Sequence, residues 1–160
     1  MSVPIVEQIA VKIAALVDAV TIASGFNQDL TAVRPKRIHL GGDLNTDGTV
    51  FLVQEDAVIE ADSNTHVIWR QGFSLGAVVI DSDDATTGID IRLNQVRSDI
   101  EKKLMTGDNW ELGGLGEILL KGSEKFVLES DFEGQTYWAG IEIKIDVLYE
   151  VNKTDPYSQT

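Results

Sequence analysis

The sequence has no cysteine, only three prolines and two histidines, and 13 basic residues against 26 acidic ones in its 160 positions. Without cysteine, the chain cannot form a disulfide framework or a thiolate metal site. The formal net charge of -13 opposes binding to nucleic acid, because such binding needs clustered Lys and Arg. Charged residues such as Glu7 and Asp18 interrupt the apolar N-terminal stretch, so we expect neither a targeting signal nor a membrane span, and no membrane partner.

Two segments have the apolar spacing of amphipathic helices. In the first, over residues 3–23, Ile5, Ile9 and Ile13 recur on one face, which predicts a helix lying on a sheet. The second begins after an acidic loop, where Thr87 can cap its start, and Gly107 can end it. Its apolar face consists of Ile89, Leu93, Val96, Ile100 and Leu104.

The remaining segments have the pattern of short strands separated by turns. We predict strands over residues 33–40, 50–53, 57–61, 65–69, 75–80, 118–120, 126–129 and 138–151. Pro35 indicates an edge position, and Gly72 and Gly76 indicate a bend or bulge. Two helices among many strands predict an α+β fold, with both helices packed on a mostly antiparallel sheet. We expect a single domain over residues 1–151 and a polar C-terminal tail over residues 152–160.

One segment resembles the first half of a calcium-binding loop. Asp43, Asn45 and Asp47 occupy its first, third and fifth positions, and a glycine occupies its sixth. The bidentate glutamate required at position 12 is replaced by Gln54, and Glu55 comes one place late. A calcium-binding or carbohydrate-facing module around this loop is therefore the alternative, and we favour a polar turn between strands.

No group of residues has the spacing of a catalytic site. Asp81, Asp83 and Asp84 could serve a metal-dependent hydrolase, but they lie together in one loop and typify a solvated, helix-capping segment. His39 and His66 stand alone on predicted strands. We therefore expect no enzymatic activity and no cofactor.

The loop after the second helix is rich in glycine. Gly113, Gly114 and Gly116 follow a helix instead of opening one, which is the wrong polarity for binding phosphate. We expect these glycines to allow close backbone contacts. The same loop carries Trp110, which we consider a candidate for an interface.

The last strand alternates strictly between apolar and mostly charged residues. One predicted face is the core face, formed by Ile141, Ile143, Ile145, Val147 and Tyr149. The other carries Glu142, Lys144 and Asp146, which are candidates for contact with water or with a partner.

The tail after this strand is polar and contains Pro156, which cannot donate a hydrogen bond to a sheet. We therefore expect the chain to leave the domain after about Val151. Asp155, Pro156 and Tyr157 are candidates for a contact with a partner, with Tyr157 as an aromatic anchor. An idle terminus is the alternative.

The order of these parts resembles the tail terminator and tail completion proteins, which are minor tail proteins of long-tailed bacteriophages. The resemblance rests on the N-terminal helix, on Asp90-Ile91-Arg92-Leu93 and Asp99-Ile100-Glu101-Lys102-Lys103-Leu104 in the central helix, on Gly113-Gly114-Leu115, and on Val147-Leu148-Tyr149-Glu150 before Asp155-Pro156-Tyr157. Residues 41–62 match no pattern of the family.

The resemblance implies a structural virion protein that is made in the cytoplasm of the bacterial host. In this family, subunits form a ring, commonly a homo-hexamer, which caps the tail tube and joins it to the head-tail connector. The expected partners are therefore further copies of the chain, the tail tube protein and the neck proteins. DNA would pass through the lumen without specific binding, which the acidic charge suits. Another neck, connector or stopper protein is the alternative within this class.

Overall fold

The chain folds as a single-sheet α+β protein. The computed structural model describes residues 2–34, 47–81, 88–128 and 137–160. Its elements are α1 (Ile5–Asp18), the 3-10 helix η1 (Ile22–Ser24), β1 (Thr31–Val33), β2 (Thr49–Asp62), β3 (His66–Asp81), α2 (Ile89–Met105), the 3-10 helix η2 (Asn109–Gly114), β4 (Glu117–Leu128) and β5 (Tyr137–Asn152). In the described chain, no helix is both long and apolar enough to cross a membrane.

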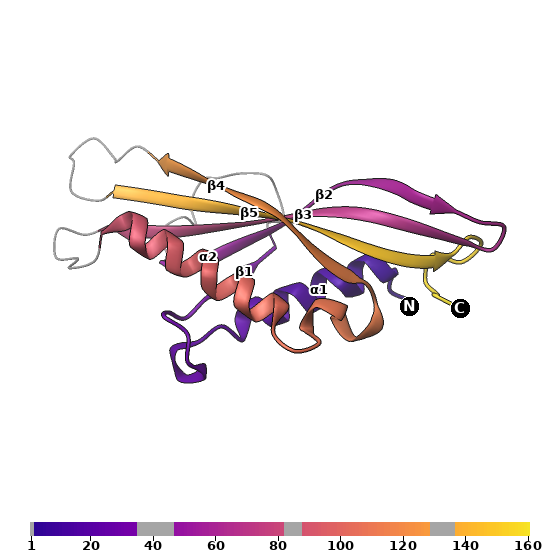
Figure 1. Ribbon diagram of the computed structural model, residues 1–160, viewed down its shortest axis with the longest axis horizontal. Helices are drawn as coiled ribbons and strands as arrows, with labels where there is room; N and C mark the ends of the chain where they lie inside the picture. Colours follow the sequence, from indigo (N-terminus) through magenta and orange to yellow (C-terminus); the bar gives the residue numbers. More distant parts are fainter. Residues whose placement is uncertain (1, 35–46, 82–87, 129–136) are drawn as a thin grey trace.

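The five strands form one sheet in the order β1-β2-β3-β5-β4. β1 pairs with β2 in parallel, and the other three pairs are antiparallel, so the predicted mostly antiparallel sheet is confirmed. Figure 1 shows α1 and α2 on the same side of this sheet. The opposite side, which we call the outer face, carries no helix of the described chain.

α1 is shorter than predicted, because it ends at Asp18 and not near residue 23. The Asp18 carboxylate accepts a hydrogen bond from the Ala32 N–H at 2.7 Å, so the end of the helix also holds β1. The chain then turns through η1, and Leu30 N–H bonds back to the Val20 carbonyl at 2.9 Å. Apolar spacing alone could not show this turn, because Val20 remains in the core after the helix has ended.

α2 spans the predicted segment, and its predicted apolar face is buried except at Ile89, which is partly buried. Gly88 occupies the N-cap position, and the predicted cap Thr87 lies outside the described residues. Lys102 and Lys103 lie in the last turn, where they complement the negative end of the helix dipole. Gly107 follows the helix with a φ of 62°.

Most of the predicted short strands are parts of long ones. The predicted break at Gln54-Glu55-Asp56 lies inside β2, where Glu55 and Asp56 together face Gly72 of β3. This is a β-bulge, in which two residues oppose one and the strand bends without ending. The bulge predicted from Gly72 is therefore present at that level of the sheet. Its extra residue belongs to β2, however, and not to the strand that contains Gly72. Further bulges place one extra residue at Glu60 in β2 and at Lys121 in β4.

The core lies between the helices and the inner face of the sheet. Ile9 and Ile13 of α1, Ile100 of α2, and Phe73 and Ile143 of the central strands are all 0–1% exposed. The predicted core face of β5 is confirmed, because all of its apolar members are buried. This core fixes the central strands and leaves the outer face and the two sheet edges for other contacts.

Candidate functional site

The outer face of the sheet carries the charged residues predicted on β5. Glu142 is half-buried and accepts a hydrogen bond from the Ser74 hydroxyl at 2.6 Å. Lys144 is exposed, whereas Asp146 is buried, with only 4% of its surface exposed. β5 lies between β3 and β4, so its main chain is paired on both sides over residues 138–148. Only its side chains can reach a partner there.

Asp146 is the centre of an ion-pair network on this face. Its carboxylate lies 3.3 Å from the Arg70 guanidinium and 3.6 Å from the Lys121 ammonium. Arg70 also binds Glu60 through two nitrogens, at 2.9 and 3.0 Å. The hydrogen bond from Arg70 lowers the pKa of the Glu60 carboxyl, and the hydrogen bonds to Glu60 and Asp146 raise the pKa of Arg70. The network explains how a carboxylate can be buried on a face that no helix covers.

Two bulges at the same level of the sheet form a hollow beside this network. Gly72 and Asp146 are register partners on the central strands. The bulges at Glu55-Asp56 and at Lys121 flank them from β2 and β4. The hollow has a volume of about 510 Å³ and is lined by Glu55, Asp56, Val58, Arg70, Gly72, Lys121 and Asp146. It is charged but mixed in sign, which suits contacts with a polar protein surface.

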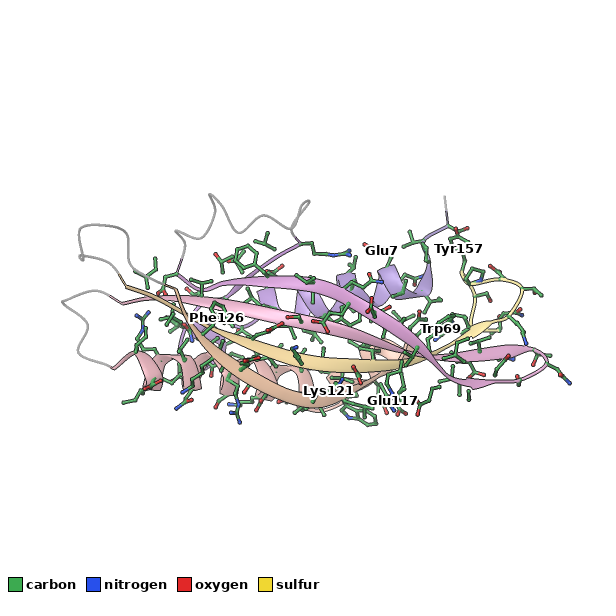
Figure 2. All side chains as sticks on the ribbon, turned by 90° about the horizontal axis from the view of Figure 1, so that it is seen from above. Glu7, Trp69, Glu117, Lys121, Phe126 and Tyr157 are labelled. Atoms are coloured by element: carbon green, nitrogen blue, oxygen red, sulfur yellow. The ribbon has the colours of Figure 1, made fainter. Side chains whose placement is uncertain are left out.

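The two margins of the sheet are open in the described chain. β1 covers β2 only as far as Phe51, so residues 52–62 form an edge, which we call the β2 edge. Glu117–Leu128 forms the other, the β4 edge, because β4 pairs only with β5 within the described residues. Glu117 and Lys121 lie along β4 in Figure 2. Open strands present unpaired N–H and C=O groups to any neighbouring chain.

Trp110 contributes to the fold, because its side chain is partly buried and packs against the core. It belongs to η2, where Leu112 and Gly113 have positive φ values of 51° and 66°. The close contact expected of the glycines is confirmed at Gly116, where a Cβ atom would lie 2.7 Å from the Leu148 carbonyl oxygen. The role of Trp110 at an interface stays a prediction.

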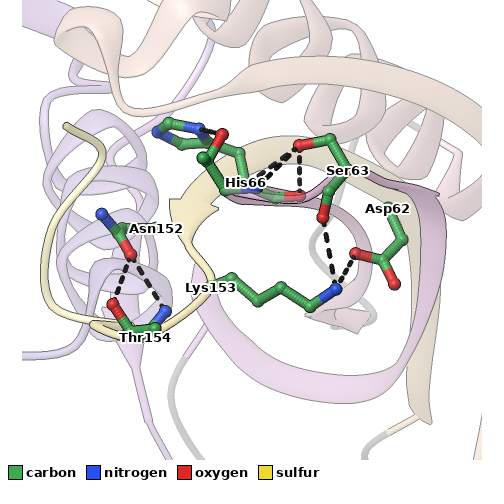
Figure 3. A network of polar contacts seen from close by, with 7 residues as sticks. Asp62, Ser63, His66, Asn152, Lys153 and Thr154 are labelled. Carbon is green, nitrogen blue, oxygen red and sulfur yellow. Dashed lines mark hydrogen bonds and ion pairs between the residues drawn. The ribbon is translucent and has the colours of Figure 1, made fainter.

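The C-terminal tail returns to the domain, so the prediction that it leaves after Val151 is wrong. Lys153 N–H bonds to the Thr65 carbonyl at 2.8 Å, and the Lys153 ammonium lies 2.7 Å from the Asp62 carboxylate. The Asn152 side chain accepts hydrogen bonds from the N–H and hydroxyl of Thr154, both at 2.9 Å. Figure 3 shows the Lys153 ammonium bound to Asp62, a contact that holds the tail to the β2–β3 hairpin, and the Asn152–Thr154 contacts within the tail.

The end of the tail reaches two further elements. The Pro156 carbonyl accepts a hydrogen bond from the Ile5 N–H at 3.4 Å, at the start of α1. The Gln159 side chain donates to the Leu115 carbonyl at 2.8 Å. The lack of an N–H on proline therefore does not release the tail, because a carbonyl can still bind. Tyr157 is 46% exposed, and its role as an anchor stays a prediction, as does that of Asp155.

Asp47 has a structural role at the base of the predicted turn. Its carboxylate accepts hydrogen bonds from the Ile80 N–H at 3.1 Å and from Arg92 at 2.9 Å. The next residue, Gly48, has a φ of 81°, and a Cβ atom there would lie 2.5 Å from the Asp29 carbonyl oxygen. The engaged Asp47 carboxylate favours a turn over a calcium loop, whereas a glycine with positive φ suits both. The other two possible ligands, Asp43 and Asn45, lie outside the described residues.

The other candidates for catalysis do not converge in the described chain. His66 contacts the neighbouring Thr65 hydroxyl, whereas His39, Asp83 and Asp84 lie outside the described residues. Within the described part of the chain, no three His, Asp or Glu side chains gather as a metal site would require.

Sequence reasoning missed Arg70, Glu60 and Lys121, which complete the network around Asp146. Two of the three are associated with bulges, and a bulge shifts the alternation of faces by one residue. Pattern reading also follows one strand at a time, whereas Glu60, Arg70 and Lys121 belong to three different strands. The sequence feature that did indicate this region was Gly72, which lies opposite the β2 bulge at Glu55-Asp56.

No protein-family model matches the sequence, and a search of curated proteins finds no match to it.

Proposed function

We propose that this chain is a structural virion protein, a subunit of the tail terminator ring that caps the tail tube of a long-tailed bacteriophage and joins it to the head connector. The proposal starts from the resemblance in the order of elements. The structural observation that supports it best is the pair of open sheet edges, the β2 edge and the β4 edge. A subunit with two different open edges can bind one neighbour on each side, and such repeated contacts close into rings when the rotation permits.

The charge of the chain also supports this function. A net charge of -13 repels the phosphate backbone, so DNA would move through the lumen of an acidic ring without sticking to it. The proposed partners are further copies of the chain, six in all, together with the tail tube protein and the neck proteins. The proposed location is the neck of the virion.

The number of copies per particle tests this function. Purified particles of the phage that encodes the chain would be digested, and the amount of the chain would be measured against the tail tube protein by quantitative mass spectrometry. We expect six copies per tail. One copy per tail, or absence of the chain from purified particles, would contradict the proposal. Imaging of labelled particles distinguishes the tail end of the neck from a stopper position nearer the head.

The calcium-binding alternative has a separate test. Because Asp47 already binds Ile80 and Arg92, we expect the melting temperature of the parent chain to be independent of added calcium. Asp47→Ala should be less stable than the parent but equally indifferent to calcium. A calcium-dependent rise that the variant loses would favour the calcium module, because a ligand that binds only the native state must stabilise it.

A further inference from the structure

The two open edges differ in charge. The β2 edge carries Glu55, Asp56, Glu60 and Asp62 and no basic residue. Glu60 and Asp62 form ion pairs with Arg70 and Lys153, whereas Glu55 and Asp56 form none within the described residues. Two β2 edges brought together would therefore repel each other, since like charges on paired strands are destabilising.

The β4 edge carries Glu117 and Glu124 as well as Lys121 and Lys125, so it has no net charge, and its basic charge begins at the bulge. Lys121 is the extra residue there, and the buried Asp146 carboxylate holds it at 3.6 Å. Lys125 lies farther along the same edge and contacts Asp90 at 3.3 Å. Both lysines are substantially exposed, at 56% and 41% of their side chains. An acidic strand placed beside this edge would therefore meet one partly accessible ammonium group toward the outer face, on Lys121, and one toward the helix side, on Lys125.

Each edge also exposes apolar side chains. Val58 and Ile59 on the β2 edge are 55% and 54% exposed, and Leu120 on the β4 edge is 44% exposed. Large apolar residues on open strands are a liability in a monomer, because they favour pairing with another chain. Pairing of the two edges would remove these side chains from water at both margins.

The directions of the strands permit this pairing without turning one molecule over. β2 is antiparallel to β3, β3 to β5, and β5 to β4, so β2 and β4 run in opposite directions within one molecule. A β2 edge placed beside the β4 edge of a neighbour in the same orientation therefore forms an antiparallel pair. The helix layers of both copies then lie on the same side of a continuous sheet.

We propose that the β4 edge of one copy binds the β2 edge of a second copy, with Lys121 and Lys125 facing the acidic residues of the β2 edge. The contact joins two different surfaces, so each copy keeps one edge free for the next neighbour. This inference deepens the proposed function and rests on it for the identity of the partner as a second copy.

Cross-linking of engineered cysteines tests the pairing, and the parent chain contributes no cysteine of its own. Glu124→Cys places a thiol on the β4 edge, and Val58→Cys places one on the β2 edge; both positions are exposed. The two proteins, one with a mass tag, would be mixed and treated with a flexible bis-maleimide. We expect a mixed dimer from the two together and no dimer from either alone. Val11→Cys on the exposed side of α1 is the matched control.

Two results would overturn the inference. A dimer from Glu124→Cys alone would show that two β4 edges pair with each other. A mixed dimer no more abundant than that of Glu124→Cys with Val11→Cys would show that the edges do not meet. Melting curves establish first that each variant folds like the parent.

Charge supplies a second measurement on the same pair. Replacing Glu55 and Asp56 together by Lys in the Val58→Cys protein should reduce the yield of the mixed dimer severalfold. Added salt should reduce the yield with the parent charges, because exposed charges are screened. A yield that neither change affects would contradict pairing through these charges.

The double variant Val58→Cys/Glu124→Cys separates this inference from the proposed function. Edge pairing should give a ladder of cross-linked products, and a ladder that stops at six copies would agree with the ring. Cross-linked products that continue beyond six copies without a largest size would support edge pairing and contradict the closed ring. Six copies per particle without any mixed dimer would support the ring and overturn the edge pairing.

Discussion

The two faces of β5 are stabilised in different ways although they alternate along one strand. On the inner face, Ile141, Ile143 and Ile145 are 0–1% exposed beneath the helix layer. On the outer face, Lys144 is exposed and Asp146 is buried among charged neighbours without a covering layer. Burial on the inner face follows from hydrophobic packing, which is non-directional. Burial of Asp146 depends on two particular cations, so the inner face should govern stability and the outer face should govern surface contacts.

The largest effect should come from the inner face. Ile143→Ala removes a side chain that is 1% exposed, so we expect it to lower the free energy of unfolding by about 2–5 kcal/mol. Ile91→Ala on α2, where the side chain is 55% exposed, is the matched control, and it should change stability by less than about 0.5 kcal/mol. Denaturant unfolding measures both. Equal losses in the two variants would contradict the assignment of the core face.

A smaller loss of stability is expected from a substitution where the outer face is tightly packed. The Phe126 ring lies over Gly140, so a Cβ atom at that position would overlap the ring. Gly140→Ala should therefore cost about 1–3 kcal/mol through overpacking. Gly76→Ala is the matched control on the adjacent strand, since a Cβ atom there meets nothing within 4 Å. Thermal melting of the pair tests whether the outer face has a packed region of its own.

Removal of the buried carboxylate should have a moderate effect. Asp146→Ala deprives Arg70 and Lys121 of a partner, but both cations are partly exposed and can be hydrated. We therefore expect a loss of about 1–2 kcal/mol. Lys144→Ala, on the same face but exposed, should be nearly neutral. If Asp146→Ala is also neutral in denaturant unfolding, the network contributes nothing to the fold.

The smallest effect is a pH dependence at the exposed Glu60–Arg70 pair. Because the pKa of Glu60 is lowered in the folded protein, its contribution to stability is present above the unfolded pKa and is lost as the pH falls through the folded pKa. Glu60→Gln should therefore weaken the fall of melting temperature on acidification below about pH 4.5. In an Arg70→Gln background, Glu60→Gln should make no further difference. An unchanged acid slope in the single variant would contradict the pairing.

Much of the fold could be predicted because apolar periodicity determines it directly. The core faces of α2 and β5 follow from apolar spacing that burial selects, and the mostly antiparallel sheet follows from the order of helical and strand segments. The bulges at Glu55-Asp56 and Lys121 could not be predicted, because each adds one residue without altering the composition of its strand. As a result, the sequence pattern of each long strand, β2 and β4, predicted two short strands.

The candidate site was predictable only in part. The alternation along β5 placed Glu142, Lys144 and Asp146 on one face, but it could not show that Asp146 is buried and the other two are not. Burial there depends on Arg70, which is far away in sequence and meets Asp146 only across the sheet. The returning tail was missed for a similar reason, since its partners Thr65, Ile5 and Leu115 are distant in the chain.

The position of β5 has a consequence for the order in which the protein can form during synthesis. β5 leaves the ribosome after the other four strands of the described chain, yet it lies between β3 and β4. Until it emerges, β4 has no partner strand within the described chain, and β3 has one free margin. Its pairing also joins residues far apart in sequence, such as Val67 and Val151, and such non-local pairing is slow because chain entropy is lost before contacts form. The nascent chain therefore has two additional open strands until β5 has emerged.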